Sequence, residues 1–214
     1  MSKLEIEITT LSPLHLGSGH ADVMVDAEVV HDEFGMPYFP AKRFKGILFE
    51  SALEVAEMAE LSQSNFLKRS DVELLFQHGT TSDVQLIVSD LFLPEIEKMR
   101  EDWKYLQKRF GSFIQPLDVL KQYTDLRYQT RLENGIAFDG SLHNMRTVDK
   151  GLSFYGTIEI ENGTEKEEQI IALALENLSS GGLKRNRGFG KIQARLMNRD
   201  QEQLIAEALK EGLQ

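Results

Sequence analysis

Residues 3–10 read KLEIEITT, and this stretch predicts the first strand of the expected fold. Leu4, Ile6 and Ile8 alternate with Glu5 and Glu7, which is the period of two that buries one face of a strand and exposes the other. Similar strand patterns follow at three other places. Residues 84–93 predict a strand beside the first, and residues 152–160 and 191–196 predict two more.

Helical spacing of apolar residues separates these strands. Residues 41–61 carry one apolar stripe at three- and four-residue intervals, and residues 95–110 indicate a second helix. Thr164 and Glu167 have capping-box spacing at the start of a third helix, which ends near residue 178. Gly181 and Gly182 are expected to supply the left-handed cap at its end. A short helix is predicted after Asp200.

The order strand, helix, strand, insertion, strand, helix, strand is that of a ferredoxin-like α+β fold. It predicts an antiparallel sheet with helices packed on one face. Val23–Val30 suggest a further extended stretch that ends in a turn at Asp32–Gly35. Residues 123–145 mix charge, glycine and aromatics without a sustained period, so we expect an insertion that projects from the core. The length of 214 residues fits a single domain, 1–214, with an insertion at about 95–147.

Charge and composition narrow the class of protein. The formal net charge is -10, which argues against non-specific coating of nucleic acid. Two short windows nevertheless hold seven of the 24 Lys and Arg residues, and a polyanion is expected to bind there. The chain has no cysteine and no apolar run near the ~20 residues that cross a bilayer. We expect no membrane contact, and the missing export signal makes the cytoplasm the default location.

The first basic window is PAKRFKG, residues 40–46. It places Lys42, Arg43 and Lys45 in the first turns of a helix, where the helix dipole disfavours cations. A phosphate at this helix start would turn the cost into a gain, because N–H groups, dipole and side chains would all favour it. The alternative is that solvated cations tolerate a small cost.

The second basic window is GGLKRNRGFGK, residues 181–191. Its glycines allow close approach of the backbone to a ligand, and its arginines suit phosphate oxygens. It lacks the GK[ST] ending of a P-loop and precedes a strand, so nucleotide hydrolysis is not expected. A basic hairpin turn without a ligand is the alternative. The candidate RNA-binding residues of this window are Gly182, Lys184, Arg185, Arg187, Gly188, Phe189, Gly190 and Lys191.

Acidic and imidazole side chains give weaker signals. An extended acidic segment carries Asp22, Asp26, Glu28, Asp32 and Glu33. One or two carboxylates there, together with phosphate oxygens, are able to hold a divalent cation. A solvated charged face is the alternative. No histidine pair has the spacing of a zinc site. His15 is either a structural residue or a contact to phosphate or base, and the sequence leaves both open.

Taken together, four pieces resemble the RAMP superfamily of CRISPR proteins, and within it the repeated backbone subunit of type III effector complexes. The pieces are SPLHLGSG (12–19), VDAEVVHDEFGMPYFP (25–40), KRFKG (42–46) and GGLKRNRGFGK (181–191), in the expected order. They run from the first strand to the last, and the middle third matches only loosely.

The resemblance implies a modified RRM-like fold with a thumb-like insertion, copies stacked along guide RNA, and target RNA paired in the groove. Other CRISPR effector subunits are further implied partners. By position, Asp26 matches the residue that cleaves target RNA with a divalent metal such as Mg²⁺, and it would then be both catalytic residue and metal ligand. His15, Lys45 and the loop 181–190 match guide-RNA contacts.

Departures from the family pattern keep other functions open. Ala27 and Glu28 stand where a small polar residue and a proline are usual, so the chain is either a target-RNA nuclease or a paralogue that binds RNA without cutting it. A stand-alone, metal-independent RAMP endoribonuclease that processes guide precursor RNA is a second reading, with a histidine as general acid or base. A module outside CRISPR that grips a phosphorylated ligand is a third.

Overall fold

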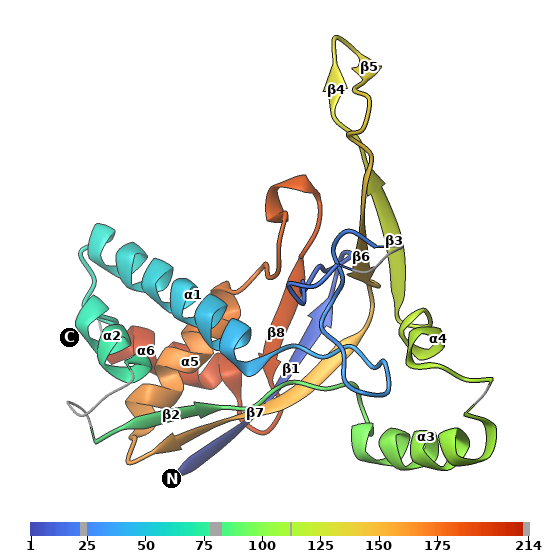
Figure 1. Cartoon of the computed structure of the whole chain (residues 1–214). Coiled ribbons are helices and arrows are strands. Elements are labelled where there is room, and N and C mark those ends of the chain that lie inside the picture. The colour runs from blue at the N-terminus through green and yellow to red at the C-terminus, as the bar shows by residue number, and fades with distance from the viewer. Residues whose placement is uncertain (22–24, 78–82, 112, 212–214) are drawn as a thin grey trace.

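The computed structural model describes residues 1–21, 25–77, 83–111 and 113–211 (Figure 1). Its centre is a four-stranded antiparallel sheet of order β2-β7-β1-β8. The elements of this core follow the chain order β–α–β–β–α–β, which confirms the ferredoxin-like α+β prediction. They are β1 (Ser2–Thr10), α1 (Ala41–Leu61), β2 (Gln85–Val88), β7 (Ser153–Glu161), α5 (Glu165–Asn177) and β8 (Ile192–Leu196).

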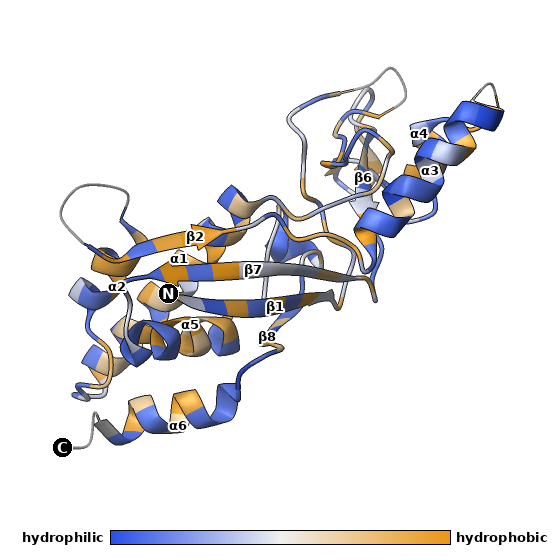
Figure 2. Cartoon of the chain, turned by 90° about the horizontal axis from the view of Figure 1, so that it is seen from below, coloured by the Kyte–Doolittle hydropathy of each residue, from blue (hydrophilic) through white to orange (hydrophobic). Residues whose placement is uncertain are grey.

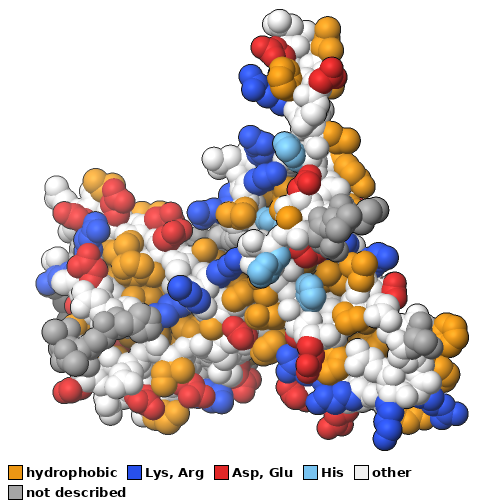
Figure 3. Space-filling model, viewed as in Figure 1, with side chains coloured by type: hydrophobic (Ala, Val, Ile, Leu, Met, Phe, Trp, Pro, Cys, Tyr) orange, Lys and Arg blue, Asp and Glu red, His pale blue; other side chains and the backbone are white. Residues whose placement is uncertain are grey.

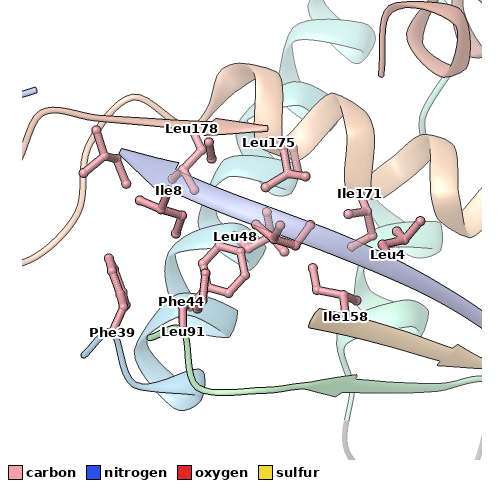
Figure 4. Packing of buried hydrophobic residues seen from close by; sticks show 14 of the residues in the cluster. Leu4, Ile8, Phe39, Phe44, Leu48, Leu91, Ile158, Ile171, Leu175 and Leu178 are labelled. Atoms are coloured by element: carbon pink, nitrogen blue, oxygen red, sulfur yellow. The ribbon is translucent and has the colours of Figure 1, made fainter. Parts of the chain in front are cut away.

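The hydrophobic core lies between the sheet and the helices on one of its faces (Figure 4). Leu4 and Ile8 of β1 point toward Leu48 of α1 and Leu175 of α5, and all four side chains are buried. Figure 2 shows α5 against the sheet and α6 (Gln201–Glu211) beyond it. The alternation in KLEIEITT therefore puts its apolar residues where expected. Within the described residues, no helix is long and apolar enough to cross a membrane.

The strand expected over residues 84–93 is shorter than predicted and has a different neighbour. Only Gln85–Val88 form β2, and β2 pairs with β7, so the prediction that it lies beside the first strand is wrong. The reason is that β7 spans nine residues and pairs on both edges, which places it between β1 and β2. Leu91 and Phe92 continue only as isolated bridges.

Two local predictions near helix ends had different outcomes. At the start of α5, the Glu167 carboxylate accepts hydrogen bonds from the Thr164 N–H at 2.6 Å and from its hydroxyl at 2.7 Å, which confirms the capping box. The C-terminus of α5 does not use the glycine pair. The helix ends at Asn177, and Leu178 after it is extended. Gly182, with φ +73°, belongs instead to the second basic window, residues 181–191, which we call the basic loop.

Two further segments between β1 and β2 differ from expectation. No local pattern predicted α2 (Arg69–Phe76), a short helix packed on α1. The extended stretch suggested for Val23–Val30 has isolated bridges at Ala27 and Val29 instead of a strand, and Val23 lies outside the described residues. The turn at Asp32–Gly35 is present, because the Gly35 N–H donates to the Asp32 carbonyl at 3.0 Å.

The insertion between β2 and β7 projects from the sheet (Figure 1). Its long antiparallel pair attaches to the core along β6: Leu14 bridges to Val148, and Ala27 bridges to Met145. The outer end is the small hairpin of β4 and β5. The elements are α3 (Ile96–Phe110), α4 (Pro116–Leu120), β3 (Thr124–Gln129), β4 (Leu132–Glu133), β5 (Ile136–Ala137) and β6 (His143–Val148).

Candidate nucleic-acid interface

A pocket of about 780 Å³ lies where the outer end of the β3–β6 pair faces the loop before β8. Asp26 and two cations of the second basic window, Lys184 and Arg187, share its wall. Figure 3 shows Lys, Arg and His side chains gathered around the base of the insertion. The remaining lining residues come mainly from the insertion: Ala27, Gln129, Thr130, Arg131, Phe138, Gly140, Ser141, His143, Asn144 and Met145.

Asp26 lines this pocket and is fixed by two hydrogen bonds to Asn144 of β6. Its Oδ2 accepts a hydrogen bond from the Asn144 N–H at 2.8 Å, and its own N–H donates to Asn144 Oδ1 at 2.8 Å. His143 Nδ1 lies 3.7 Å from the same Oδ2. More than half of the Asp26 side chain is exposed. The carboxylate is therefore fixed in direction and still open to solvent.

Glu28, which stands where the family pattern has a proline, forms a structural ion pair with Arg146. Its carboxylate accepts from Arg146 Nε at 2.8 Å and 3.1 Å, and both side chains are nearly buried. The Arg146 N–H donates to the Ala27 carbonyl at 3.0 Å. A buried charge needs its partner, because leaving it unpaired in a low dielectric is costly. This ion pair fastens the Asp26 segment to the insertion.

His15 lies inside the protein, with 2% of its surface exposed. Its Nδ1–H donates to the Arg146 carbonyl at 2.7 Å, and its own carbonyl accepts from the Leu183 N–H at 3.1 Å. Burial lowers the pKa of the imidazole, and the charges of Lys184 and Arg43 lower it further. Of the two alternatives left by the sequence, the geometry favours the structural one: neutral His15 joins the insertion to the basic loop.

The basic loop takes a shape that requires glycine at two positions. Gly182 has φ +73°, and a Cβ there would lie 2.6 Å from the His15 carbonyl oxygen. Gly190 has φ +78°, and a Cβ there would lie 2.1 Å from the Gly181 oxygen. Between them, Arg185–Arg187 form a single 3-10 turn. The backbone is thus packed against residues 13–15 while the cationic side chains point outward.

The other members of the loop divide into exposed and structural residues. Lys184, Arg185, Arg187 and Gly188 are exposed, whereas Phe189 is half-buried. Lys184 Nζ donates to Gln129 Oε1 at 2.7 Å and so links the loop to β3. The Lys191 backbone N–H donates to Ser12 Oγ at 2.9 Å, at the point where the loop enters β8.

The first basic window does not act as one cluster. Arg43 donates to the Gly17 carbonyl, on the side of α1 that faces the basic loop. Lys42 and Lys45 line a different cavity, between α1 and β2. The helical period explains this division, since residues 42 and 45 lie on one face while 43 lies on another. Of these three cations, Arg43 is the one whose charge acts on His15, the residue that contacts the basic loop.

Sequence reasoning missed most of the insertion's contribution to the pocket. Gln129, Arg131, Asn144 and Arg146 come from a region without sustained periodicity. Antiparallel pairing of β3 with β6 brings Gln129 opposite His143 and so assembles that wall. A local signal that sequence reasoning did not use is the presence of three arginines, Arg127, Arg131 and Arg146, in residues 127–146.

A metal ion at Asp26 would depend on ligands from outside the chain. Among the described residues, no group of three or more His, Cys, Asp or Glu side chains has the geometry to hold a metal. Asp22 lies outside those residues. Mg²⁺ is commonly held by one or two carboxylates together with substrate phosphates and water, so Asp26 fits a site completed by RNA.

The fold and the pocket define an α+β protein in which a basic loop faces a projecting insertion across an exposed carboxylate. The sequence was also compared with models of known protein families. The model of the RAMP superfamily matches residues 7–193, and the chain belongs to that superfamily. A search of curated proteins gave no match.

Two solved structures have a similar fold. A chain in the cryo-EM structure of type III-B Cmr-beta bound to cognate target RNA is 13% identical, with a TM-score of 0.66; the match covers 96% of this chain and 99% of that one. A chain in the apo-state cryo-EM structure of type III-B Cmr-beta is also 13% identical, with a TM-score of 0.63 and coverage of 92% and 97%. At this identity the likeness concerns the fold.

Proposed function

We propose that the chain is a guide-RNA-binding backbone subunit of a type III CRISPR effector complex. The observation that carries the proposal is the shared pocket, in which Asp26 lies with Lys184 and Arg187 between the basic loop and the insertion. Membership of the RAMP superfamily and a fold similar to a chain of type III-B Cmr-beta bound to target RNA support it.

In this proposal, residues 1–214 form one RAMP domain, and the segment at about 95–147 is its thumb. The exposed cations of the basic loop bind guide-RNA phosphates, and His15 holds the loop against the insertion. Target RNA pairs with the guide beside Asp26. The partners are guide RNA, target RNA, other effector subunits and further copies of the chain, acting in the cytoplasm.

Asp26 is the residue we assign to target cleavage. In the reaction, the 2'-hydroxyl gives its proton to a water molecule as its oxygen bonds to the adjacent phosphorus. The bond from phosphorus to the 5'-oxygen breaks, and the leaving oxygen takes a proton from water, so the products are a 2',3'-cyclic phosphate and a 5'-hydroxyl. Lys184 and Arg187 line the same pocket as Asp26 and would stabilise the negative charge that accumulates on the phosphate. A divalent ion such as Mg²⁺, when bound by Asp26 and RNA phosphates, would neutralise further charge.

A paralogue that binds RNA without cutting it is the second candidate. It is favoured by the hydrogen bond from Asn144 to the Asp26 carboxylate, which gives this side chain a structural use independent of catalysis. Glu28, where a proline is usual, is likewise committed to Arg146. Cleavage assays separate the two candidates, because both bind RNA.

The test uses the RNA-loaded complex purified from its host, with the bound guide sequenced and a complementary target added. Asp26→Asn keeps an acceptor for the Asn144 N–H but removes the charge, so cleavage should fall by about 100-fold or more while target affinity stays unchanged. EDTA should abolish wild-type cleavage.

Asp139→Asn is the matched control, since Asp139 is an exposed acid on the same insertion and the variant should cut normally. Full cleavage by Asp26→Asn would remove Asp26 from the mechanism. A wild-type complex that binds target RNA without cutting it would establish the second candidate. A complex that contains no RNA would refute both.

A further inference from the structure

The basic loop lies between the insertion and α1, and its cations face both of them (Figure 1). Lys184 and Arg187 line the Asp26 pocket on the side of the insertion. Arg185 extends instead toward α1, where its Nη1 lies 3.7 Å from Oε2 of Glu50. Glu50 thus brings a negative charge to a loop whose proposed ligand is a polyanion.

The position of Glu50 is set by the face of α1 that packs toward the basic loop. Ile47 of this face lies against the loop, because a Cβ at Gly181 would be 3.2 Å from Ile47 Cδ1. Glu50 follows Ile47 by three residues, so the two side chains are neighbours on the helix surface. The carboxylate therefore reaches Arg185 from a packed helix.

The contact between Glu50 and Arg185 is loose. Its 3.7 Å exceeds the length of a hydrogen bond, and the two side chains are 61% and 46% exposed. Exposed pairs of this kind add little to folding stability. A guanidinium forms two parallel hydrogen bonds with a phosphate, which is a stronger contact. A phosphate is therefore able to displace Glu50, although the nearby carboxylate reduces what the phosphate gains.

The next carboxylates along α1 lie farther from the loop cations. Glu54 accepts a hydrogen bond from Asn177 Nδ2 at 2.9 Å and so links α1 to the end of α5. Glu57 is exposed and stands about 10 Å from Glu50 along the helix axis, which is about one screening length at physiological salt. Of these three carboxylates, Glu50 is the one paired with a cation of the basic loop.

We propose that Glu50 is an intramolecular competitor for phosphate: it occupies Arg185 in the RNA-free protein and is displaced when RNA binds. The proposal rests on the RNA-binding function proposed above and deepens it, because it identifies a residue that lowers the affinity of the basic loop. A ligand that holds Arg185 alone binds weakly as a result. A strand that also contacts Lys184 and Arg187 has further contacts to offset the loss.

Glu50→Gln removes the charge and nearly keeps the shape of the side chain. At about 0.15 M salt, the full-length variant should bind a fluorescein-labelled single-stranded RNA about two- to fivefold more tightly than the wild type. Its slope of log affinity against log salt should be steeper by up to about 0.7, because the phosphate at Arg185 is no longer opposed. In an Arg185→Ala background, the same substitution should change the affinity by less than about 1.5-fold.

Glu57→Gln is the matched control, because it removes the same charge from the same helix at a greater distance from the loop. Its RNA affinity should stay within about 1.5-fold of the wild type. The thermal midpoints of both RNA-free variants should lie within about 2 °C of the wild type, so that altered folding does not explain a change in affinity.

Four results would overturn the role of Glu50 alone, provided that the wild type binds RNA and Arg185→Ala/Arg187→Ala binds it more weakly. They are an unchanged affinity of Glu50→Gln, an equal gain in Glu57→Gln, a gain that persists without Arg185, and weaker binding by Glu50→Gln. The last would mean that the carboxylate orders Arg185 for phosphate. Failure of the wild type to bind RNA would refute the proposed function as well.

Discussion

His15 illustrates how a single buried side chain can join two parts of a binding surface without touching the ligand. Its ring donates to the Arg146 carbonyl of the insertion, while its backbone carbonyl holds Leu183 of the basic loop. The tautomer follows from these partners, because a carbonyl only accepts and Nδ1 must therefore carry the proton. His15 therefore links the insertion to the basic loop through hydrogen bonds of its ring and its backbone carbonyl.

Burial of His15 predicts a pH dependence of stability. Because its pKa is lowered in the folded state, the unfolded chain binds a proton that the folded chain does not, and stability falls as pH drops below the unfolded value of about 6.5. His15→Asn, whose amide can donate like Nδ1, should lose less stability between about pH 7 and pH 5. Urea unfolding at several pH values measures this.

His20→Asn serves as the control, because His20 is an exposed histidine. It should follow the wild-type pH curve. Equal curves for His15→Asn and the wild type would mean that His15 does not contribute to this dependence.

The basic loop is the element in which charge and backbone shape are both fixed. Gly182 and Gly190 let it pack against residues 13–15, and the turn at Arg185–Arg187 keeps the cations outward. The local positive charge outweighs the net charge of -10 because screening limits repulsion by distant carboxylates to about 8–10 Å at physiological salt. An acidic chain can therefore bind RNA at one loop.

Replacement of Arg185 and Arg187 by alanine should weaken RNA binding and flatten its salt dependence. The slope of log affinity against log salt should fall by about 0.7 for each phosphate that the variant no longer neutralises on single-stranded RNA. Titrations at several salt concentrations give the slope. Arg69→Ala, which removes an exposed cation of α2 paired with Glu73, should leave it unchanged. An unaltered slope in the double variant would exclude the loop as a phosphate-binding element.

At the scale of the whole molecule, the insertion is tied to the core by a small set of polar links, and the Arg146–Glu28 pair is the most buried of the ion pairs among the described residues. It joins β6 to the segment that carries Asp26, while Lys184 and Gln129 join the basic loop to β3. Lys184 and Gln129 both line the Asp26 pocket, so their hydrogen bond joins two of its walls. The position of the insertion is therefore coupled to the site.

Arg146→Met should destabilise the protein by about 3–5 kcal/mol, because it leaves the Glu28 carboxylate buried without its partner. The double variant Arg146→Met/Glu28→Leu should recover most of that stability, since an apolar pair needs no compensation. Denaturant unfolding measures both. A cost below about 1 kcal/mol for Arg146→Met, as for a surface pair, would contradict this role.

Local patterns predicted α1, α3, α5 and α6 well, missed α2 and α4, and predicted the strand neighbours poorly. The bounds of α1 follow from its apolar stripe and from Pro40, and the capping box of α5 follows from Thr164 and Glu167. The neighbour of β2 was mispredicted, because strand patterns define faces and leave pairing partners open. Lys42 and Lys45 were grouped with Arg43 because they are close in sequence, although the helix turns them to different sides.

The sequence by itself determined the β–α–β–β–α–β order, the helix and strand faces, and the two places where positive charge concentrates, because these depend on residues close along the chain. Only the tertiary structure decided that Asp26 shares a pocket with Lys184 and Arg187, that Glu28 pairs with Arg146, and that Lys45 faces a separate cavity. These arrangements involve residues more than a hundred positions apart or opposite sides of one helix. The first two arise from packing of the insertion and the basic loop against the core, which no local pattern encodes. The third follows from the turn of α1 and from the position of β2 beside it.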